Sequence, residues 1–254
     1  MSYRTIQVRF EEPICYIRFY RPEQKNTINS ELVDECHAAL NCCEASARIV
    51  VLEGLSDVFC LGADFVEIKE LAANRGGSQL TAEPLYKLWG KLATGPYITI
   101  AHVRGKANAG GIGFVAASDI VLAADTAEFS LSELLFGLLP ACVLPFLIRR
   151  IGLQKAKYMT LMTQPISVQQ AYNWGLVDAY EQQSDILLRK HLLRLRPLSK
   201  ASITRFKRYV NQLNTLIADS HSIAVALNHE VFSDPVNISI IARYLEKGLF
   251  PWEE

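Results

Sequence analysis

Nine residues decide how this chain folds: GKANAGGIG, residues 105–113. They follow a predicted strand and run into a predicted helix. The turn between the strand and the helix is rich in Gly and Ala. Such a turn leaves backbone N–H groups unpaired at the helix start, where they point at any anion or carbonyl oxygen in front of them. The stretch FCLGAD, residues 59–64, has the same character and also follows a buried strand. For either turn alone, the simpler interpretation is tight packing of the strand against the helix, because Gly and Ala permit close backbone approach. If the two turns face each other, their N–H groups would make an oxyanion hole with two donors.

Short strands and helices alternate through the first two thirds of the chain, and helices then take over. Apolar patterns predict strands at 14–20, 49–52, 97–103, 120–123 and 128–131, and helical spacing predicts a helix from Asn29 or Ser30. This order predicts an α/β fold with a core at residues 1–183 and a helical C-terminal region at 184–254. The polar stretch from Ala73 to Pro84, rich in Gly and Ser, predicts a mobile loop.

The composition is typical of a globular protein and disfavours nucleic acid and membranes as partners. Half of the 254 residues are apolar, and 26 Lys and Arg balance 26 Asp and Glu. A zero net charge without charged blocks gives no field that would gather a polyanion. We find no targeting pattern at the N-terminus and no apolar run of about 18 residues, so we expect a cytosolic location.

The cysteines form no Cys-x-x-Cys pair, and the histidines have no ligand spacing with them. Most lie among apolar neighbours, where reduced structural thiols are usually found. We therefore predict structural roles and no zinc site for the six cysteines: Cys15, Cys36, Cys42, Cys43, Cys60 and Cys142.

Several motifs occur in the order and spacing of one enzyme family. The run 58–68, the turn 105–113, and FSLSE (129–133) followed by GLLP (137–140) resemble the crotonase, or enoyl-CoA hydratase/isomerase, superfamily. Arg21-Pro22 with NTIN (26–29) resembles its acyl-carrier-binding motif, and residues 232–250 resemble its last helix. The resemblance covers nearly the whole chain. It implies a crotonase-type spiral of ββα units with a helical C-terminal trimerisation region, and acyl thioesters of coenzyme A or an acyl carrier protein as substrates.

The resemblance also implies a catalytic site. Its two oxyanion donors fall on the backbone N–H groups of Ala63 and Gly110. Hydratases of the family carry two glutamates: the second matches Glu133, but the first falls on Gly113, which has no side chain. Glu133 would then act alone, removing the α-proton and protonating the departing β-hydroxyl. Its apolar neighbours would raise its pKa; the alternative is a solvated residue at a helix start.

A narrower resemblance concerns the substrate. GGIGF (110–114), SLSELLFG (130–137), PACVLPF (140–146) and FPWE (250–253) look like the dehydratases of polyketide β-branching cassettes. These remove water from a 3-hydroxy-3-methylglutaryl-type group on an acyl carrier protein, giving 3-methylglutaconyl. The resemblance implies a hydro-lyase with no metal or redox cofactor, whose substrate is carried on phosphopantetheine or coenzyme A. It implies an acyl carrier protein as partner, and a homotrimer or a dimer of trimers.

Four more polar residues are candidates for substrate contact. Lys106 or Tyr86 would meet a distal carboxylate, Asn108 would bond a substrate hydroxyl, and Lys25 would steer a phosphate of the pantetheine arm. Each also has a simpler interpretation, in which it packs, faces solvent or stabilises its own turn. Cys142 is expected to pack, because no cation stands near it in sequence to activate the thiol.

Two other functions stay open. In a decarboxylase of the same superfamily, the oxyanion hole alone would drive loss of carbon dioxide, with a proton from Tyr86 or another acid. Gly113 also makes a catalytically silent thioester-binding scaffold conceivable. An ordinary fatty-acyl hydratase is disfavoured, because Gly113 cannot orient water with a carboxylate.

Overall fold

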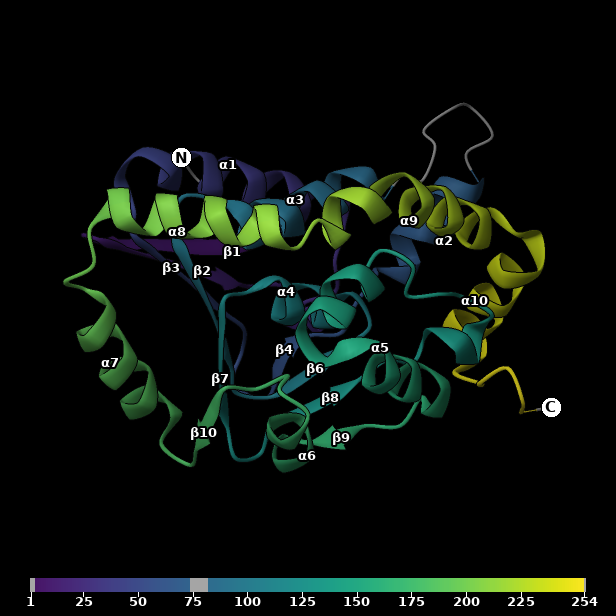
Figure 1. Cartoon of the computed structure of the whole chain (residues 1–254). Coiled ribbons are helices and arrows are strands. Elements are labelled where there is room, and N and C mark those ends of the chain that lie inside the picture. The colour runs from purple at the N-terminus through teal and green to yellow at the C-terminus, as the bar shows by residue number, and fades with distance from the viewer. Residues whose placement is uncertain (1–2, 74–81, 254) are drawn as a thin grey trace.

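The computed structural model describes residues 3–73 and 82–253, which form two β-sheets surrounded by helices (Figure 1). The larger sheet has the order β1-β2-β3-β5-β7-β10 and contains Ile6–Glu11 (β1), Ile14–Phe19 (β2), Ile49–Glu53 (β3), Ile98–Val103 (β5), Ile120–Ala124 (β7) and Ala179–Glu181 (β10). The smaller sheet has the order β4-β6-β8-β9 and contains Val58–Cys60 (β4), Lys106–Asn108 (β6), Glu128–Ser130 (β8) and Ile166–Ser167 (β9).

Each repeating unit of the fold gives one strand to each sheet. The pairs β3 and β4, β5 and β6, and β7 and β8 all run from the larger sheet into the smaller one, and helices or turns follow. Within each sheet these strands are parallel neighbours. The chain therefore winds as a spiral of ββα units, which confirms the predicted fold class.

Helices cover the sheets and make up the end of the chain. They are Ser30–Ser46 (α1), Phe65–Ala73 (α2), Glu83–Thr94 (α3), Gly110–Ala117 (α4), Leu144–Met162 (α5), Val168–Asn173 (α6), Ser184–Leu195 (α7), Lys200–Leu213 (α8), Leu216–Ser233 (α9) and Pro235–Lys247 (α10), with 3₁₀ turns at Pro22–Gln24 (η1) and Glu133–Phe136 (η2). The side chain of Asn29 accepts a hydrogen bond from the Leu32 N–H and caps α1, as predicted. From Ser184 onward, every described element is a helix.

Two strands lie inside stretches that the sequence analysis treats as turns. Val58–Cys60 and Lys106–Asn108 form β4 and β6, which pair in parallel through Val58 with Lys106 and Cys60 with Ala107. Strands of three residues are too short to show a period of two. Their pairing is what places the two small-residue turns next to each other.

The helix that follows the second turn, α4, lies in the core. Residues 111–117 are all buried, and α4 packs between α3 and α5. A helix that is apolar on every side has to be buried on every side. The first residue of α4, Gly110, is therefore held by surroundings that leave little room for movement.

The C-terminal helices close one end of the molecule, where α2, α9 and α10 gather (Figure 1). Helix α10 packs on α2 and η2. The Asn237 side chain donates hydrogen bonds to the carbonyls of Gly137 (3.1 Å) and Val231 (2.9 Å), which joins the start of α10 to the end of η2 and to α9. Of the predicted loop at 73–84, residues 74–81 lie outside the described residues. No described helix has the length and apolar character that crossing a membrane requires.

Candidate active site

The two small-residue turns touch each other. A Cβ atom on Gly62 would lie 2.6 Å from the Ala109 Cβ and 3.1 Å from the Gly110 nitrogen, so only glycine allows this approach. The φ of Gly62 is +90°, a conformation that also favours glycine. Ala109 itself has a φ of 50°, which is rare for a residue with a side chain. The strained backbone at Ala109 places Gly110 opposite Gly62.

The backbone N–H groups of Ala63 and Gly110 have no hydrogen-bond partner among the described residues. Ile28 donates to the carbonyl of Gly62 at 2.7 Å and accepts from the N–H of Asp64 at 2.9 Å. Because successive amides of an extended chain point in opposite directions, the Ala63 N–H points away from Ile28. Gly110 is the first residue of α4, so its N–H lacks a partner within the helix. Two unpaired donors therefore lie side by side.

The N-terminal motif fixes the first of these turns. Arg21 forms an ion pair with the Asp64 carboxylate at 2.8 Å, and the Asn26 amide donates to the carbonyls of Phe19 and Phe59. Asp64 also accepts from the N–H of Val66 and so caps α2. These contacts hold the chain on both sides of Ala63 in place.

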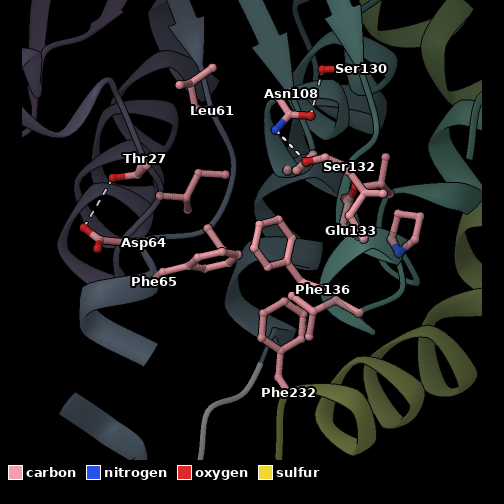
Figure 2. Close-up of a pocket in the computed structure, with 18 of the residues that line it drawn as sticks. Thr27, Leu61, Asp64, Phe65, Asn108, Ser130, Ser132, Glu133, Phe136 and Phe232 are labelled. Carbon is pink, nitrogen blue, oxygen red and sulfur yellow. Dashed lines mark hydrogen bonds between the residues drawn. The ribbon is translucent and has the colours of Figure 1, made fainter. Parts of the chain in front are cut away.

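Both turns line a cavity of about 710 Å³, a size typical of small-molecule sites. Figure 2 shows Thr27 and Asp64 on one side of it, and Asn108, Ser132 and Glu133 on the other. Aromatic side chains from η2, α2 and the C-terminal region line it as well: Phe65, Phe136, Phe232, Tyr244 and Phe250. Sequence reasoning missed this aromatic wall, because residues 232–250 reach the cavity only through tertiary packing.

Glu133 begins η2, lines the cavity and is only 8% exposed. Burial raises its pKa from 4.5 to about 7, an effect that the backbone N–H groups of Glu133 and Ser132 partly offset. Its Oε2 has no hydrogen-bond partner. A carboxyl group with a pKa near 7 can both accept and return a proton at neutral pH. The alternative interpretation, a solvated helix-start residue, is wrong.

Asn108 links two serines across the strand ends. The Ser130 hydroxyl donates to Asn108 Oδ1 at 2.8 Å, and Asn108 Nδ2 donates to the Ser132 hydroxyl at 2.9 Å (Figure 2). All three residues line the cavity, and Ser132 directly precedes Glu133. The Asn108 amide therefore joins the ends of β6 and β8 next to Glu133. Its contact with a substrate hydroxyl stays a prediction.

Gly113 has no room for a side chain. A Cβ atom there would lie 2.3 to 2.6 Å from three ring carbons of Trp89, so the indole fills the space beside it. The other acidic residues along the cavity are Glu23, which is exposed, and Asp64, which is paired with Arg21. Within the described residues, Glu133 is thus the one buried carboxyl group without an ion pair that lines this cavity.

Two predicted substrate contacts lie elsewhere. The Tyr86 hydroxyl donates to the carbonyl of Ile217 at 2.6 Å, and Tyr86 does not line the cavity. Lys106 is exposed, pairs with Glu128 at 3.4 Å and also lies outside it. The contacts support the simpler interpretation of each residue, packing for Tyr86 and a solvent-facing side chain for Lys106. The period of a helix or strand does not say which of its faces meets the cavity. Lys25 lines the cavity and is exposed.

The cysteines lie mostly in the core. Cys42 is exposed and the other five are buried. Cys142 lines the cavity, but its thiol donates to the Ala224 carbonyl and burial raises its pKa to about 12, so it packs as predicted. In residues 3–73 and 82–253, no three His, Cys, Asp or Glu side chains cluster as metal ligands would.

The burial of Glu133 predicts that the free energy of unfolding differs between the parent chain and Glu133→Gln, and that this difference depends on pH in the absence of substrate. Its folded-state pKa lies above the unfolded value, so the folded chain is destabilised as pH rises from about 4.5 to about 7. At about 1.4 kcal/mol per pH unit this amounts to about 3 kcal/mol. Urea unfolding should therefore show Glu133→Gln to be more stable than the parent chain at pH 8, and the advantage should vanish near pH 4.5. If the difference in free energy of unfolding between Glu133→Gln and the parent chain stayed constant from pH 4.5 to pH 8, it would contradict the burial of the ionised carboxylate.

The chain is similar to known proteins over its full length. A family model described as enoyl-CoA hydratase/isomerase matches residues 9–254. Bacillaene synthase dehydratase PksH of Bacillus subtilis (strain 168) is 59% identical over 256 residues, which cover 100% of this chain and 98% of the relative. A probable enoyl-CoA hydratase, echA8, of Mycobacterium bovis is 29% identical over 253 residues and 97% of each chain.

A solved structure agrees with these sequence matches. The crystal structure of a putative polyketide biosynthesis enoyl-CoA hydratase (pksH) from Bacillus subtilis has a TM-score of 0.95 and 59% identity, covering 98% of this chain and 100% of that one. The similarities confirm the resemblance read from the motifs and the expectation of a hydro-lyase. The chain belongs to the enoyl-CoA hydratase/isomerase family.

Proposed function

We propose that the protein dehydrates a 3-hydroxy-3-methylglutaryl-type acyl thioester, carried on an acyl carrier protein, to the 3-methylglutaconyl thioester. One observation carries the proposal: a single buried glutamate, Glu133, lines the same cavity as the two unpaired amides of Ala63 and Gly110. The name of the relative that is 59% identical, a dehydratase of bacillaene synthase, supports a role in polyketide assembly.

The amides act on the thioester oxygen. When the α-proton leaves, negative charge develops on that oxygen, and the N–H groups of Ala63 and Gly110 stabilise it. One such donor is typically worth about 3 to 4 kcal/mol in the transition state. Because the two turns are packed against each other through Gly62, the donors need no rearrangement when the charge appears.

Glu133 moves both protons. Its carboxylate removes the α-proton and becomes a neutral acid, and the electrons of the C–H bond form the enolate. As the enolate collapses to the carbon–carbon double bond, the bond from carbon to the β-hydroxyl breaks, and the departing oxygen takes the proton from Glu133 as water. A pKa near 7 suits both halves of this cycle. A hydroxyl on a tertiary carbon leaves readily, so a single acid suffices.

The substrate arm enters past Lys25. This lysine is exposed and lines the cavity, where its ammonium can meet a phosphate of phosphopantetheine or coenzyme A. The aromatic side chains of Phe65, Phe136 and Phe232 line the cavity (Figure 2). In the proposed complex they would exclude water from the reacting end of the substrate. The protein uses no metal or redox cofactor of its own, since the reaction consists of proton transfers and departure of hydroxide.

The subunits assemble as a homotrimer or a dimer of trimers. Helix α8 presents three large apolar side chains to solvent: Phe206, Tyr209 and Leu213 are 67%, 60% and 68% exposed. A contiguous row of exposed apolar side chains is a candidate contact with another protein chain. Sedimentation should give at least a trimer for the parent chain and smaller species for Phe206→Glu with Leu213→Glu. A monomeric parent chain would contradict the assembly.

Mass spectrometry of the carrier-bound acyl group tests the proposed function. The protein should remove one water from 3-hydroxy-3-methylglutaryl carrier protein and leave 3-methylglutaconyl carrier protein unchanged. Loss of carbon dioxide from the second substrate would instead show the decarboxylase. Tyr86 lies outside the cavity, so another residue would have to supply the proton for that activity. Binding of carrier protein with neither change would show a silent scaffold.

A further inference from the structure

Two residues that line the cavity, Trp89 and Glu133, each carry a buried polar atom without a hydrogen-bond partner. Four buried side-chain atoms among residues 3–73 and 82–253 have no hydrogen-bond partner: Trp89 Nε1, Arg104 Nε, Glu133 Oε2 and His221 Nε2. Of the four residues, only Trp89 and Glu133 line the cavity. A buried polar group without a partner destabilises the folded chain, so such an atom at a binding site is a candidate for a hydrogen bond to a ligand.

Packing fixes the indole of Trp89. Trp89 is 1% exposed, and its ring meets the rings of Phe114 and Phe146 edge to face, with centroids 5.8 Å apart in both cases. The ring also lies against Gly113, where an added Cβ would be 2.5 Å from Cε2, the carbon bonded to Nε1. Its Cζ2 lies 3.9 Å from the Cβ position of Gly110. The six-membered ring of the indole therefore lies beside the first turn of α4, and Nε1 is bonded to a ring carbon that lies against Gly113.

The two atoms differ in chemistry, and this selects the group that fits them. The indole Nε1–H can only donate, and an ionised Glu133 can only accept. A hydroxyl is able to accept from the first and donate to the second. A carboxylate would be repelled by ionised Glu133, a ketone has no proton to donate, and a methyl group would leave both atoms unpaired.

We propose that Trp89 is a catalytic residue that binds the β-hydroxyl oxygen of the substrate through its indole N–H, while Glu133 faces the same hydroxyl. This inference rests on the proposed dehydration. When the bond from carbon to oxygen breaks, the oxygen gains negative charge before it takes the proton from Glu133. The Trp89 N–H stabilises that charge and remains protonated throughout, so the balance of atoms is unchanged.

The rate test removes only the N–H. Substitution of Trp89 by 3-benzothienylalanine, which has sulfur in place of the indole N–H, should lower kcat about 10- to 100-fold and change KM less than threefold. Trp89→Phe should show at least the same loss of kcat. Trp252→Phe is the matched control, since Trp252 is 60% exposed and does not line the cavity; it should keep the parent rate. A benzothienyl variant with the parent kcat would overturn the proposal.

A binding test separates this inference from the proposed function. Indole ¹⁵N labelling gives one N–H signal for each of Trp89, Trp174 and Trp252. In the Glu133→Gln variant, 3-hydroxy-3-methylglutaryl pantetheine should move the Trp89 signal downfield, and 3-methylglutaryl pantetheine, which lacks the hydroxyl, should not. Equal shifts with both ligands would overturn the role of Trp89. Failure of the parent protein to release water, with this difference in shift preserved, would overturn the proposed dehydration alone.

Discussion

Replacement of Glu133 by Gln is expected to lower the rate of dehydration about 10²- to 10⁴-fold, the usual contribution of a general acid–base group. Gln keeps the volume and polarity of the side chain but can neither take the α-proton nor deliver it to the departing hydroxyl. The fold should persist, because burial of the ionised carboxylate is a cost that Gln removes. Turnover of carrier-bound substrate, followed by mass spectrometry, measures the effect.

Glu128→Gln is the matched control for this variant. Glu128 lies five residues away in β8, its side chain is 46% exposed, and its ion pair with Lys106 lies outside the cavity. An exposed ion pair is worth little, so the control should retain the parent rate. Parent-like turnover in Glu133→Gln, or an equal loss in Glu128→Gln, would remove Glu133 from the mechanism.

The second large effect is expected from Gly62→Ala. The new Cβ would lie 2.6 Å from the Ala109 Cβ and 3.1 Å from the Gly110 nitrogen, so the two turns must separate. If one amide then no longer reaches the thioester oxygen, kcat should fall about 10²- to 10³-fold. Steady-state kinetics with the same carrier-bound substrate would show a loss mainly in kcat.

Gly175→Ala controls for backbone strain. Gly175 has a φ of +81°, close to the +90° of Gly62, but an added Cβ would meet no atom within 4 Å. Both variants should lose stability through the positive φ, and this loss can be measured by urea unfolding. When activity is corrected for the fraction of folded protein, only Gly62→Ala should be less active than the parent chain. Equal activities in the two variants would show that contact between the turns does not matter for catalysis.

The sequence predicted the parts of the site that are local in the chain. The turns at 59–64 and 105–113 were found because small residues follow apolar strands, and Glu133 was found through its motif. Its burial was expected from the apolar residues around it, and the structure confirms that burial, which raises the pKa of Glu133.

The sequence did not predict which face of a helix meets the cavity. It also did not predict which residues far apart in the chain pack together there. Tyr86 and Trp89 lie three residues apart on α3, yet Trp89 lines the cavity, whereas Tyr86 bonds to the carbonyl of Ile217 at α9. Periodicity says that both are buried but not against what. Phe232 and Phe250 follow Glu133 by about a hundred residues, and only the packing of α10 on α2 and η2 brings this region to the cavity.

Hydrogen exchange at the α-carbon tests the central claim most directly, because it isolates the first proton transfer. The 3-methylglutaryl thioester of the carrier protein has an α-proton but no hydroxyl to lose. In D₂O the parent protein should replace one α-hydrogen of this analogue with deuterium, and Glu133→Gln should replace none above the background rate. Exchange at the parent rate in Glu133→Gln, or no exchange with the parent protein, would contradict an enolate held by two backbone amides and formed by one glutamate.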